Sequence, residues 1–171
     1  MKKIYITGIS GTGKSFIAEK LNEKGIYTID IDSHEYGLCK WKNKKTRENV
    51  YFEHGMSKDW MEAHGWFCDF EKLNNLLDIQ SDIAIAVGIT TNQNEYLSMF
   101  DKVFLLHCRE EIFLKRLHTR TSNYFGKHPL EKEYILSFYK DFEKDLIEKG
   151  AIPINTEDSI KNVVDNIISH L

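Results

Sequence analysis

Residues 8–15 read GISGTGKS, and this stretch decides the fold. It fits the pattern G-x-x-x-x-G-K-[ST], a glycine-rich turn between a strand and a helix whose backbone N–H groups bind phosphate. Residues 3–7 form a short apolar run before the turn, and apolar residues within 16–21 have helical spacing after it. Because both flanks of the motif are in place, the sequence predicts a binding site for a nucleoside triphosphate.

The residues of this loop have separate expected roles. Gly8, Gly11 and Gly13 allow the backbone to curl around the phosphates, and the helix N-terminus adds a favourable dipole. Lys14 is expected to reach the β- and γ-phosphates, and Ser15 to hold Mg²⁺. The residues expected to contact the nucleotide are Gly8, Ser10, Gly11, Thr12, Gly13, Lys14, Ser15 and Phe16.

Length and composition favour one domain that acts on small molecules. The chain has 171 residues, enough for one substantial core, and its 23 basic and 26 acidic residues nearly balance. No basic stripe recurs along a helix, which argues against duplex nucleic acid as a partner. No apolar run approaches the roughly 20 residues of a membrane helix, and the three cysteines form no C-x-x-C pair. We expect a single cytoplasmic domain over residues 1–171, monomeric or homodimeric and without membrane contact.

Short apolar runs alternate with helical patterns, which is typical of a parallel sheet covered on both faces. The predicted strands are residues 3–7, 26–30, 82–88, 102–107 and 151–155. Amphipathic helices are predicted at residues 70–77, 135–146 and 160–171. Two stretches break the pattern, about residues 33–66 and about residues 121–130. We expect both to lie over the carboxyl ends of the strands, where open α/β sheets bind ligands.

The second predicted strand ends in Asp30, Ile31 and Asp32. In an extended chain both carboxylates lie on one side. One could hold Mg²⁺ through water, and the other could accept the proton of an attacking hydroxyl. The alternative is that either aspartate caps the turn that follows. A pair placed after a phosphate loop favours the catalytic interpretation.

Arg116 and Arg120 lie one helical turn apart, just before the segment TSNYFGK. At this spacing both guanidinium groups leave the same helix face. Arginines carried by a closing segment neutralise the charge of a phosphoryl group in transfer. In this interpretation Gly126 supplies a hinge and Lys127 a further positive charge. The alternative is that the two arginines serve solubility on a surface helix.

Together, the phosphate loop, D-x-D after the second strand and R-x-x-x-R before a short lid resemble the nucleoside monophosphate kinase and shikimate kinase group of small P-loop kinases. The resemblance spans nearly the whole chain. It implies a three-layer α/β P-loop NTPase fold, with a five-stranded parallel sheet in the order 2-3-1-4-5 and helices on both faces. It also implies that the loop binds ATP and Mg²⁺, and that Asp32 contacts the acceptor or the metal. By the same resemblance, Arg116 lies against the adenine, Arg120 lies on the phosphates, and Asn155 and Thr156 flank the base.

The end of the third predicted strand departs from this group. It has only Gly88, where shikimate kinases have a glycine triplet and nucleotide kinases an aspartate with glycine. No carboxylate follows it and neither N-K-x-D nor D-x-x-G occurs, which disfavours mechanochemical ATPases and GTP-specific folds. We predict an ATP-dependent phosphotransferase for a small metabolite or nucleotide, with Lys14, Asp32 and Arg120 catalytic and with Ser15 and Asp32 at the metal. The alternatives are a regulatory P-loop ATPase and a nucleoside monophosphate kinase proper.

The stretch of residues 33–66 is the expected acceptor-binding insertion, and residues 121–130 are the expected lid. The insertion is rich in aromatic and basic residues, which suits a flat or sugar-like molecule bearing phosphate or carboxylate. For each tryptophan, packing in the core is the favoured interpretation and contact with a ligand is the alternative, because large aromatic residues dominate small cores. His34 is a minor candidate for proton transfer, with solvent exposure as its alternative. The remaining pocket candidates are Tyr36, Leu38, Trp41, Lys42, Lys44, Arg47, Trp60, His64 and Trp66.

Overall fold

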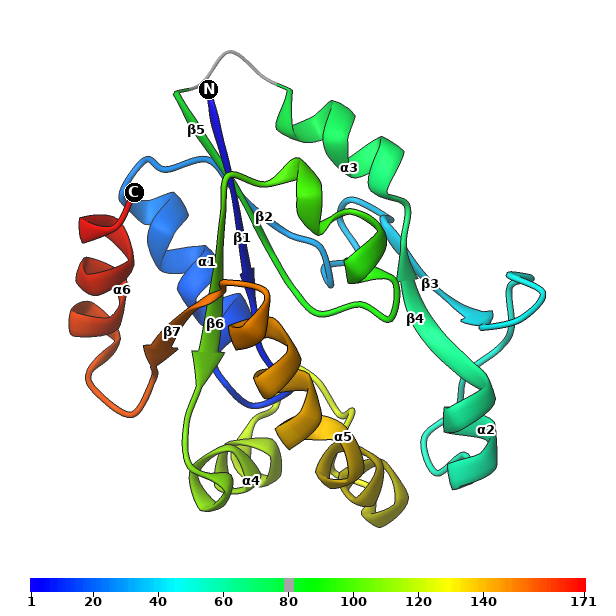
Figure 1. Ribbon diagram of the computed structural model, residues 1–171. Helices are drawn as coiled ribbons and strands as arrows, with labels where there is room; N and C mark the ends of the chain where they lie inside the picture. Colours follow the sequence, from blue (N-terminus) through cyan, green and yellow to red (C-terminus); the bar gives the residue numbers. More distant parts are fainter. Residues whose placement is uncertain (79–81) are drawn as a thin grey trace.

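The computed structural model describes residues 1–78 and 82–171. A five-stranded parallel sheet forms its centre, in the order β2-β5-β1-β6-β7 (Figure 1). The strands are β1 (Lys2–Thr7), β2 (Thr28–Asp30), β5 (Ile83–Val87), β6 (Lys102–His107) and β7 (Ile152–Asn155). Counted along the chain within this sheet, the order is 2-3-1-4-5. The predicted parallel sheet and its strand order are therefore confirmed.

Helices cover both faces of the sheet and its carboxyl edge. They are α1 (Lys14–Glu23), α2 (Lys58–Ala63), α3 (Phe70–Leu77), α4 (Glu110–Thr119), α5 (Pro129–Glu148) and α6 (Ile160–Ser169), with the 3-10 turns η1 (Gln93–Glu95) and η2 (Leu97–Met99). None of them, within the residues described, is long and apolar enough to cross a membrane.

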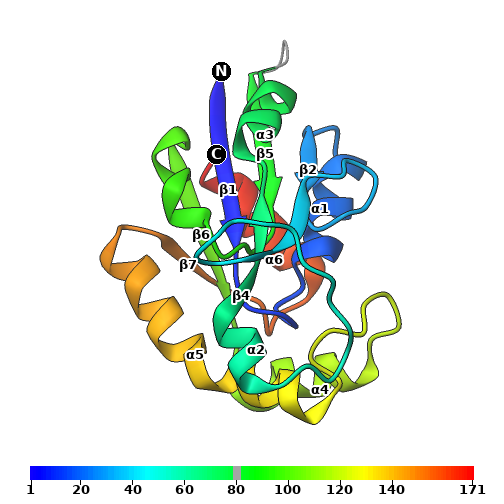
Figure 2. The ribbon, with the colours of Figure 1, turned by 90° about the vertical axis from the view of Figure 1, so that its right-hand side faces the viewer.

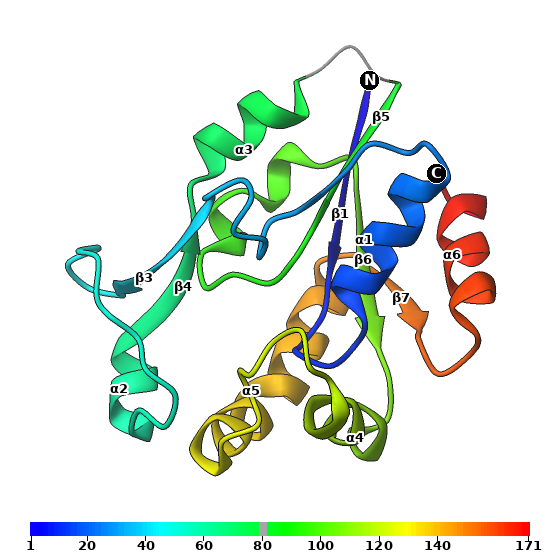
Figure 3. The same cartoon turned by 180° about the vertical axis from the view of Figure 1, so that it is seen from behind.

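The side chains of β1 alternate between the two faces, as the pleat of a strand requires. Ile4 and Ile6 are fully buried and pack with apolar residues of α1 and α6, which cover one face (Figure 3). Tyr5, also fully buried, points to the other face and packs with residues of α3 and with Phe100. The buried stripe predicted for the last helix is confirmed, since Val163, Val164 and Ile167 of α6 are buried.

The phosphate loop, α4 and α5 lie at the edge where the parallel strands end, the lower edge in Figure 1. Ile9 of the loop is fully buried against Phe113 of α4 and Ile135 of α5. Helix α5 begins at Pro129, with the side chain of His128 accepting a hydrogen bond from the first turn. The segment between α4 and α5 is therefore residues 120–128, and the last two residues of the predicted lid belong to α5. We call residues 120–128 the lid.

The sequence did not reveal a hairpin beside the main sheet. Strands β3 (Cys39–Asn43) and β4 (His64–Cys68) form a separate antiparallel pair, with Trp41 opposite Trp66. Helix α2 directly precedes β4, and in Figure 2 the hairpin and α2 lie in front of the sheet. The hairpin continues two residues past Trp66, where the predicted insertion ends. Both strands have only five residues. The side chains of β3 are mostly partly buried, and β4 alternates only over its first four residues, so neither gives a strong strand signal in the sequence.

Candidate functional site

The phosphate loop follows β1 and depends on three glycines. Gly11 and Gly13 have φ angles of 93° and 96°, in the left-handed region that favours glycine. A Cβ atom on Gly8 would lie 2.5 Å from the carbonyl oxygen of Leu106. One on Gly11 would lie 2.8 Å from that of Phe113. Because side chains do not fit there, the loop presents backbone to a ligand, as an anion cradle does.

The N-terminus of α1 adds to this cradle. Its capping residue is Gly13, and no side chain caps the first turn, which also has no acidic residue. Unpaired amides and the helix dipole together bind anions at such an end. Ser15 is exposed in this turn, and the neighbouring Phe16 is also exposed, with the ammonium of Lys20 5.4 Å from its ring centroid. The predicted positions of Ser15 and Phe16 are thus accessible beside the cradle.

The side chains of Lys14 and Thr12 donate hydrogen bonds to carbonyl groups of the loop itself. The hydroxyl of Thr12 donates to the carbonyl of Ile9 at 2.8 Å. The ammonium of Lys14 donates to the carbonyls of Gly8 and Ile9, at 2.7 and 3.0 Å. Burial lowers the pKa of Lys14 to about 8, although the carboxylate of Asp32 opposes this change. The ammonium of Lys14 is therefore poorly solvated, and a triphosphate in the cradle would stabilise its charge.

The two aspartates after β2 do not lie on one side of an extended chain, so that prediction is wrong. The chain turns after Asp30, with the amide of Ser33 donating to the Asp30 carbonyl at 3.1 Å. The Asp30 carboxylate accepts from the amide of Asp32 at 3.0 Å. Asp30 therefore caps the turn, which was the alternative interpretation for either aspartate. Of the two, Asp32 lines the cavity described below, whereas Asp30 acts on Lys14 and Asp32 through its charge.

Asp32 is held by two donors. The indole N–H of Trp66 donates to its Oδ1 at 2.9 Å, and the backbone N–H of Ile89 also donates to its carboxylate. Burial raises the pKa of Asp32 to about 6, and the nearby ammonium of Lys14 partly offsets this. A carboxyl group with a pKa near neutrality can take a proton from a hydroxyl and release it again.

Arg116 and Arg120 point to different places, so the prediction of a shared helix face is wrong. Helix α4 ends at Thr119, and Arg120 follows in an extended conformation with ψ of 148°. The guanidinium of Arg116 donates to the hydroxyl and the carbonyl of Thr156, at 3.0 and 2.6 Å. That of Arg120 donates to the carbonyl of Phe125 in the lid.

The loop after β7 lies with Arg116 at the carboxyl edge of the sheet. Thr156 is buried, and its amide donates to the carbonyl of His107 at 2.9 Å. Asn155 is exposed at the end of β7, and its side chain accepts from the amide of Glu157 at 2.8 Å. Contacts of Asn155 and Thr156 with a nucleotide base stay predictions.

Arg120 interacts electrostatically with both Lys14 and Asp32, so these three residues share one site. Burial lowers the pKa of Arg120. Its Nε atom is buried and has no hydrogen-bond partner among the described residues. Such an orphaned cationic donor beside a backbone cradle fits a phosphate oxygen, because a buried N–H without a partner is costly.

The residues also fit Mg²⁺ bound through a nucleotide. No group of three or more His, Cys, Asp or Glu side chains able to hold a metal occurs in the described ranges. Mg²⁺ on a nucleotide needs few protein ligands, because phosphates and water complete its octahedron. The exposed hydroxyl of Ser15, at the cradle, suits this role, while metal binding by Asp32 stays a prediction.

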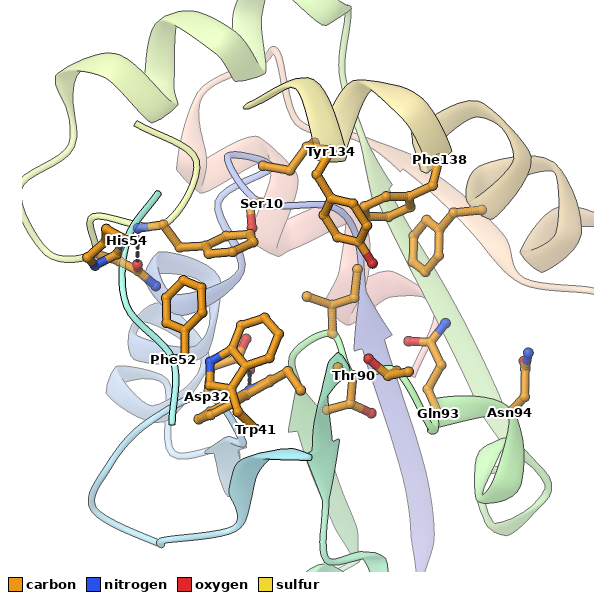
Figure 4. Close-up of a pocket in the computed structure, with 18 of the residues that line it drawn as sticks. Ser10, Asp32, Trp41, Phe52, His54, Thr90, Gln93, Asn94, Tyr134 and Phe138 are labelled. Atoms are coloured by element: carbon orange, nitrogen blue, oxygen red, sulfur yellow. Dashed lines mark hydrogen bonds between the residues drawn. The ribbon is translucent and has the colours of Figure 1, made fainter. Parts of the chain in front are cut away.

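A cavity of about 460 Å³ lies next to the loop, within the usual size range of small-molecule sites (Figure 4). Ser10 and Asp32 form the part nearest the cradle. The hairpin region contributes Trp41, Phe52 and Trp66, and the lid contributes Asn123 and Phe125. The opposite side is formed by α5, with Tyr134, Ile135, Phe138, Phe142 and Asp145, and the segment after β5 adds Ile89, Thr90, Thr91, Gln93 and Asn94.

The structure places only some of the predicted acceptor residues in the cavity lining. Trp41 and Trp66 line the cavity, as predicted for an acceptor pocket, and so does His34, the minor candidate for proton transfer. Trp60 stacks on His64 with ring centroids 4.3 Å apart and does not line it. The predicted cationic ends are wrong, because none of Lys42, Lys44 and Arg47 is among the described lining residues, and Tyr36 and Leu38 belong to the core. Sequence reasoning missed Gln93 and the side chains of α5.

Glu131 joins the lid to the insertion. It is fully buried in the first turn of α5. One carboxylate oxygen contacts Nδ1 of His54 at 2.8 Å and accepts from the amide of Gly55 at 3.2 Å. The other accepts from the amide of Gly126 at 2.6 Å. Gly126 is therefore buried and fixed in this structure, and the ammonium of Lys127 lies over the ring of Tyr124.

We expect Glu131→Ala to lower the free energy of unfolding by about 2–4 kcal/mol, because each buried donor left unpaired costs about 1–3 kcal/mol. Urea unfolding of the variant measures this loss. Glu133→Ala, at an exposed position of the same helix, should change stability by less than about 0.5 kcal/mol. Equal losses in the two variants would mean that Glu131 does not fasten the lid.

Comparison with known proteins agrees with this geometry. A protein-family model described as an AAA domain matches residues 4–135, which include the phosphate loop, the hairpin and the lid. No curated protein matches the sequence.

Several solved structures are similar over almost their whole length. Shikimate kinase from Acinetobacter baumannii in complex with shikimate is 19% identical, with a TM-score of 0.63 over 99% of this chain and 92% of that one. Deoxyadenosine kinase from M. mycoides with bound dATP is 18% identical, with a TM-score of 0.62 over 98% of each chain. A gluconokinase from Sinorhizobium meliloti is 16% identical, with a TM-score of 0.52 over 98% of this chain and 90% of that one. At these identities the likeness shows a shared fold, and the resemblance to small P-loop kinases is confirmed.

Proposed function

The chain belongs to the AAA domain family, and from this premise we propose that it is an ATP-dependent phosphotransferase for a small-molecule acceptor. The observation that carries the proposal is the continuity of two sites. Ser10 of the phosphate loop and Asp32 both line the cavity of about 460 Å³. A γ-phosphate held in the loop would thus lie at the end of the cavity that contains the Asp32 carboxylate.

Each charged residue has a distinct part in the proposed reaction. The loop amides and Lys14 bind the β- and γ-phosphates, and Arg120 uses its free Nε on the transferring group. Asp32 accepts the proton of the acceptor hydroxyl, whose oxygen attacks the γ-phosphorus as the bond to ADP breaks. Mg²⁺ bound at Ser15 would supply further charge neutralisation. Arg116, fixed by Thr156, and Asn155 would flank the adenine.

The alternatives receive less support from the cavity. A regulatory ATPase would expose residues 33–66 as a partner surface, whereas Trp41, Phe52 and Trp66 of this region are partly buried and line the cavity. A nucleoside monophosphate kinase needs cations for the acceptor phosphate, and no Lys or Arg is found among the described residues of the lining.

The proposal is tested by incubating purified protein with γ-labelled ATP, Mg²⁺ and pools of acceptors: nucleosides, nucleotides, sugars, hydroxy acids and cofactor precursors. We expect label in one acceptor class at a rate well above hydrolysis. Label that passes only to water with every pool would favour the regulatory alternative and contradict the proposal.

We expect kcat/KM to depend on pH with two limbs. Activity rises through about pH 6, as Asp32 loses its proton, and falls through about pH 8, as Lys14 loses its own. The indole hydrogen bond of Trp66 lowers the pKa of Asp32. Trp66→Phe should therefore move the acidic limb upward by about one pH unit, since a hydrogen bond to a charged group is worth about 1.5–3 kcal/mol.

The matched control for this experiment is Trp60→Phe. Trp60 packs in the same aromatic cluster as Trp66, but its indole does not contact Asp32. In Trp60→Phe, both limbs of the pH profile of kcat/KM should stay at their wild-type positions. An acidic limb that is unchanged in Trp66→Phe would show that Asp32 is not the group that controls it.

A further inference from the structure

The charges around the cavity restrict the acceptor that the proposed function would use. The ionisable side chains in the described lining are Asp32, Asp145, His34, His54 and Tyr134, with no Lys or Arg. Two cations lie beside the lining residues, and each already has an anionic partner. Arg47 pairs with Glu95 at 2.7 Å. Lys149 pairs with Asp145 at 2.7 Å and donates to Oδ1 of Asn94 at 3.1 Å. A phosphate or carboxylate on the acceptor would therefore enter this cavity without a free cationic partner in the described lining, which is unfavourable for a buried charge.

Two aromatic walls face each other across the cavity. On one side, the rings of Trp41 and Phe52 are stacked, with centroids 4.5 Å apart and planes 15° from parallel. On the other, Tyr134 and Phe138 project from α5, with centroids 5.1 Å apart (Figure 4). Walls of this kind suit a flat molecule, because a planar ring can stack on an aromatic face or meet its edge.

Gln93 adds a fixed polar group to the cavity lining. Gln93 is buried, with 5% of the residue exposed, and its Oε1 accepts from the hydroxyls of Thr7 and Tyr5 at 3.2 and 3.4 Å. These two donors set the orientation of the carboxamide. The amide nitrogen has no hydrogen-bond partner among the described residues, and Gln93 lines the cavity. It can therefore donate to a ring nitrogen or carbonyl of a bound molecule.

We propose that the acceptor is an uncharged molecule with a planar heteroaromatic ring and an alcohol, which is the chemistry of a nucleoside. This inference rests on the proposed function. The ring lies between the two aromatic walls and accepts a hydrogen bond from Gln93, while the alcohol lies at Asp32. The alcohol oxygen forms a bond to the γ-phosphorus, the bond from that phosphorus to ADP breaks, and the alcohol proton passes to Asp32.

The acceptor class is tested with γ-labelled ATP and Mg²⁺ against the ribo- and deoxyribonucleosides, their 5′-monophosphates, shikimate and neutral sugars. We expect at least one nucleoside to be phosphorylated with kcat/KM at least 100-fold above that of its 5′-monophosphate. Preference for a monophosphate, shikimate or a sugar would overturn the inference and leave the proposed function intact. Transfer to no acceptor of any class would overturn both.

Two variants test the walls and the donor. Trp41→Leu and Gln93→Met should each raise KM for the nucleoside at least tenfold and leave KM for ATP within twofold. The matched control is Trp60→Leu, because Trp60 packs against Trp41 but does not line the cavity. It should leave both KM values within threefold. An unchanged nucleoside KM in Trp41→Leu, or an equal rise in Trp60→Leu, would contradict the assignment.

A gain of function tests the charge argument without depending on lost activity. Asn94 is exposed, lines the cavity and accepts a hydrogen bond from the ammonium of Lys149 at 3.1 Å. Asn94→Arg removes this exposed bond and adds a cation at the cavity, with little effect expected on folding. The ratio of kcat/KM for the nucleoside to that for its monophosphate should fall at least tenfold. A ratio that does not change would show that the absence of a cation does not determine the acceptor class.

Discussion

Lys14→Ala is expected to reduce phosphoryl transfer by a hundredfold or more, because removing one preorganised charge contact costs about 10²–10³ in rate. The loss should come from chemistry and ATP binding and not from unfolding. Lys14 is buried and its bonds in this structure are to the carbonyls of Gly8 and Ile9. Steady-state kinetics and circular dichroism of the variant measure the two effects separately.

The control for Lys14→Ala is Lys20→Ala. Lys20 lies on the same helix, and its ammonium pairs with Glu23 at 2.6 Å on the surface. Its removal should leave the rate within about threefold, because exposed ion pairs contribute only about 0–1 kcal/mol. Normal turnover by Lys14→Ala would refute the role of the loop in phosphate binding.

The second large effect is expected for Asp32→Asn. We expect a loss of about 10²–10⁴ in kcat, the range for removal of a general base. Asn fills the same space, so KM for ATP should change little. Asp30→Asn is the matched control, because an amide oxygen can still accept the bond from the Asp32 amide that caps the turn. Losses of similar size in both variants would mean that charge near the loop matters but that Asp32 has no specific role.

Asp32→Asn also has a predicted effect on stability. The pKa of Asp32 is raised in the folded state, so its ionised form destabilises the fold above about pH 6, and this cost disappears as the pH falls toward 4. The free energy of unfolding of the variant, relative to wild type, should therefore be higher at pH 8 than at pH 4. Urea unfolding at the two pH values measures the difference. If the difference between variant and wild type did not depend on pH, the Asp32 carboxyl would be solvated in the folded state, contrary to this prediction.

The sheet was predictable because each strand carries its own signal. Apolar runs with β-branched residues, separated by helical patterns, indicated the five parallel strands, and the resemblance to small P-loop kinases implied their order. The loop was predictable for a different reason. The φ angles of Gly11 and Gly13 lie in a region that favours glycine. Glycines at these positions in the sequence therefore predict the conformation of the loop.

The acceptor side was less predictable, because its geometry comes from tertiary contacts. The pattern of Asp30 and Asp32 suggested an extended pair, but the chain turns immediately after β2. Gln93 and Tyr134 read as ordinary residues of a turn and a helix until the fold places them around one cavity. In the sequence, Glu131 is an ordinary acidic residue in the first turn of a helix. Only its buried contacts in the structure show that it connects the hairpin region to the lid.

The central claim is that one phosphate loop delivers the γ-phosphoryl group of ATP to the cavity above Asp32. A crystal structure with Mg²⁺ and a non-hydrolysable ATP analogue tests it most directly. We predict that the triphosphate is bound by the amides of residues 8–15, with Lys14 and Arg120 on the γ-phosphate and the γ-phosphate open to the cavity. A triphosphate bound elsewhere, or one whose γ-phosphate faces away from Asp32, would contradict the account.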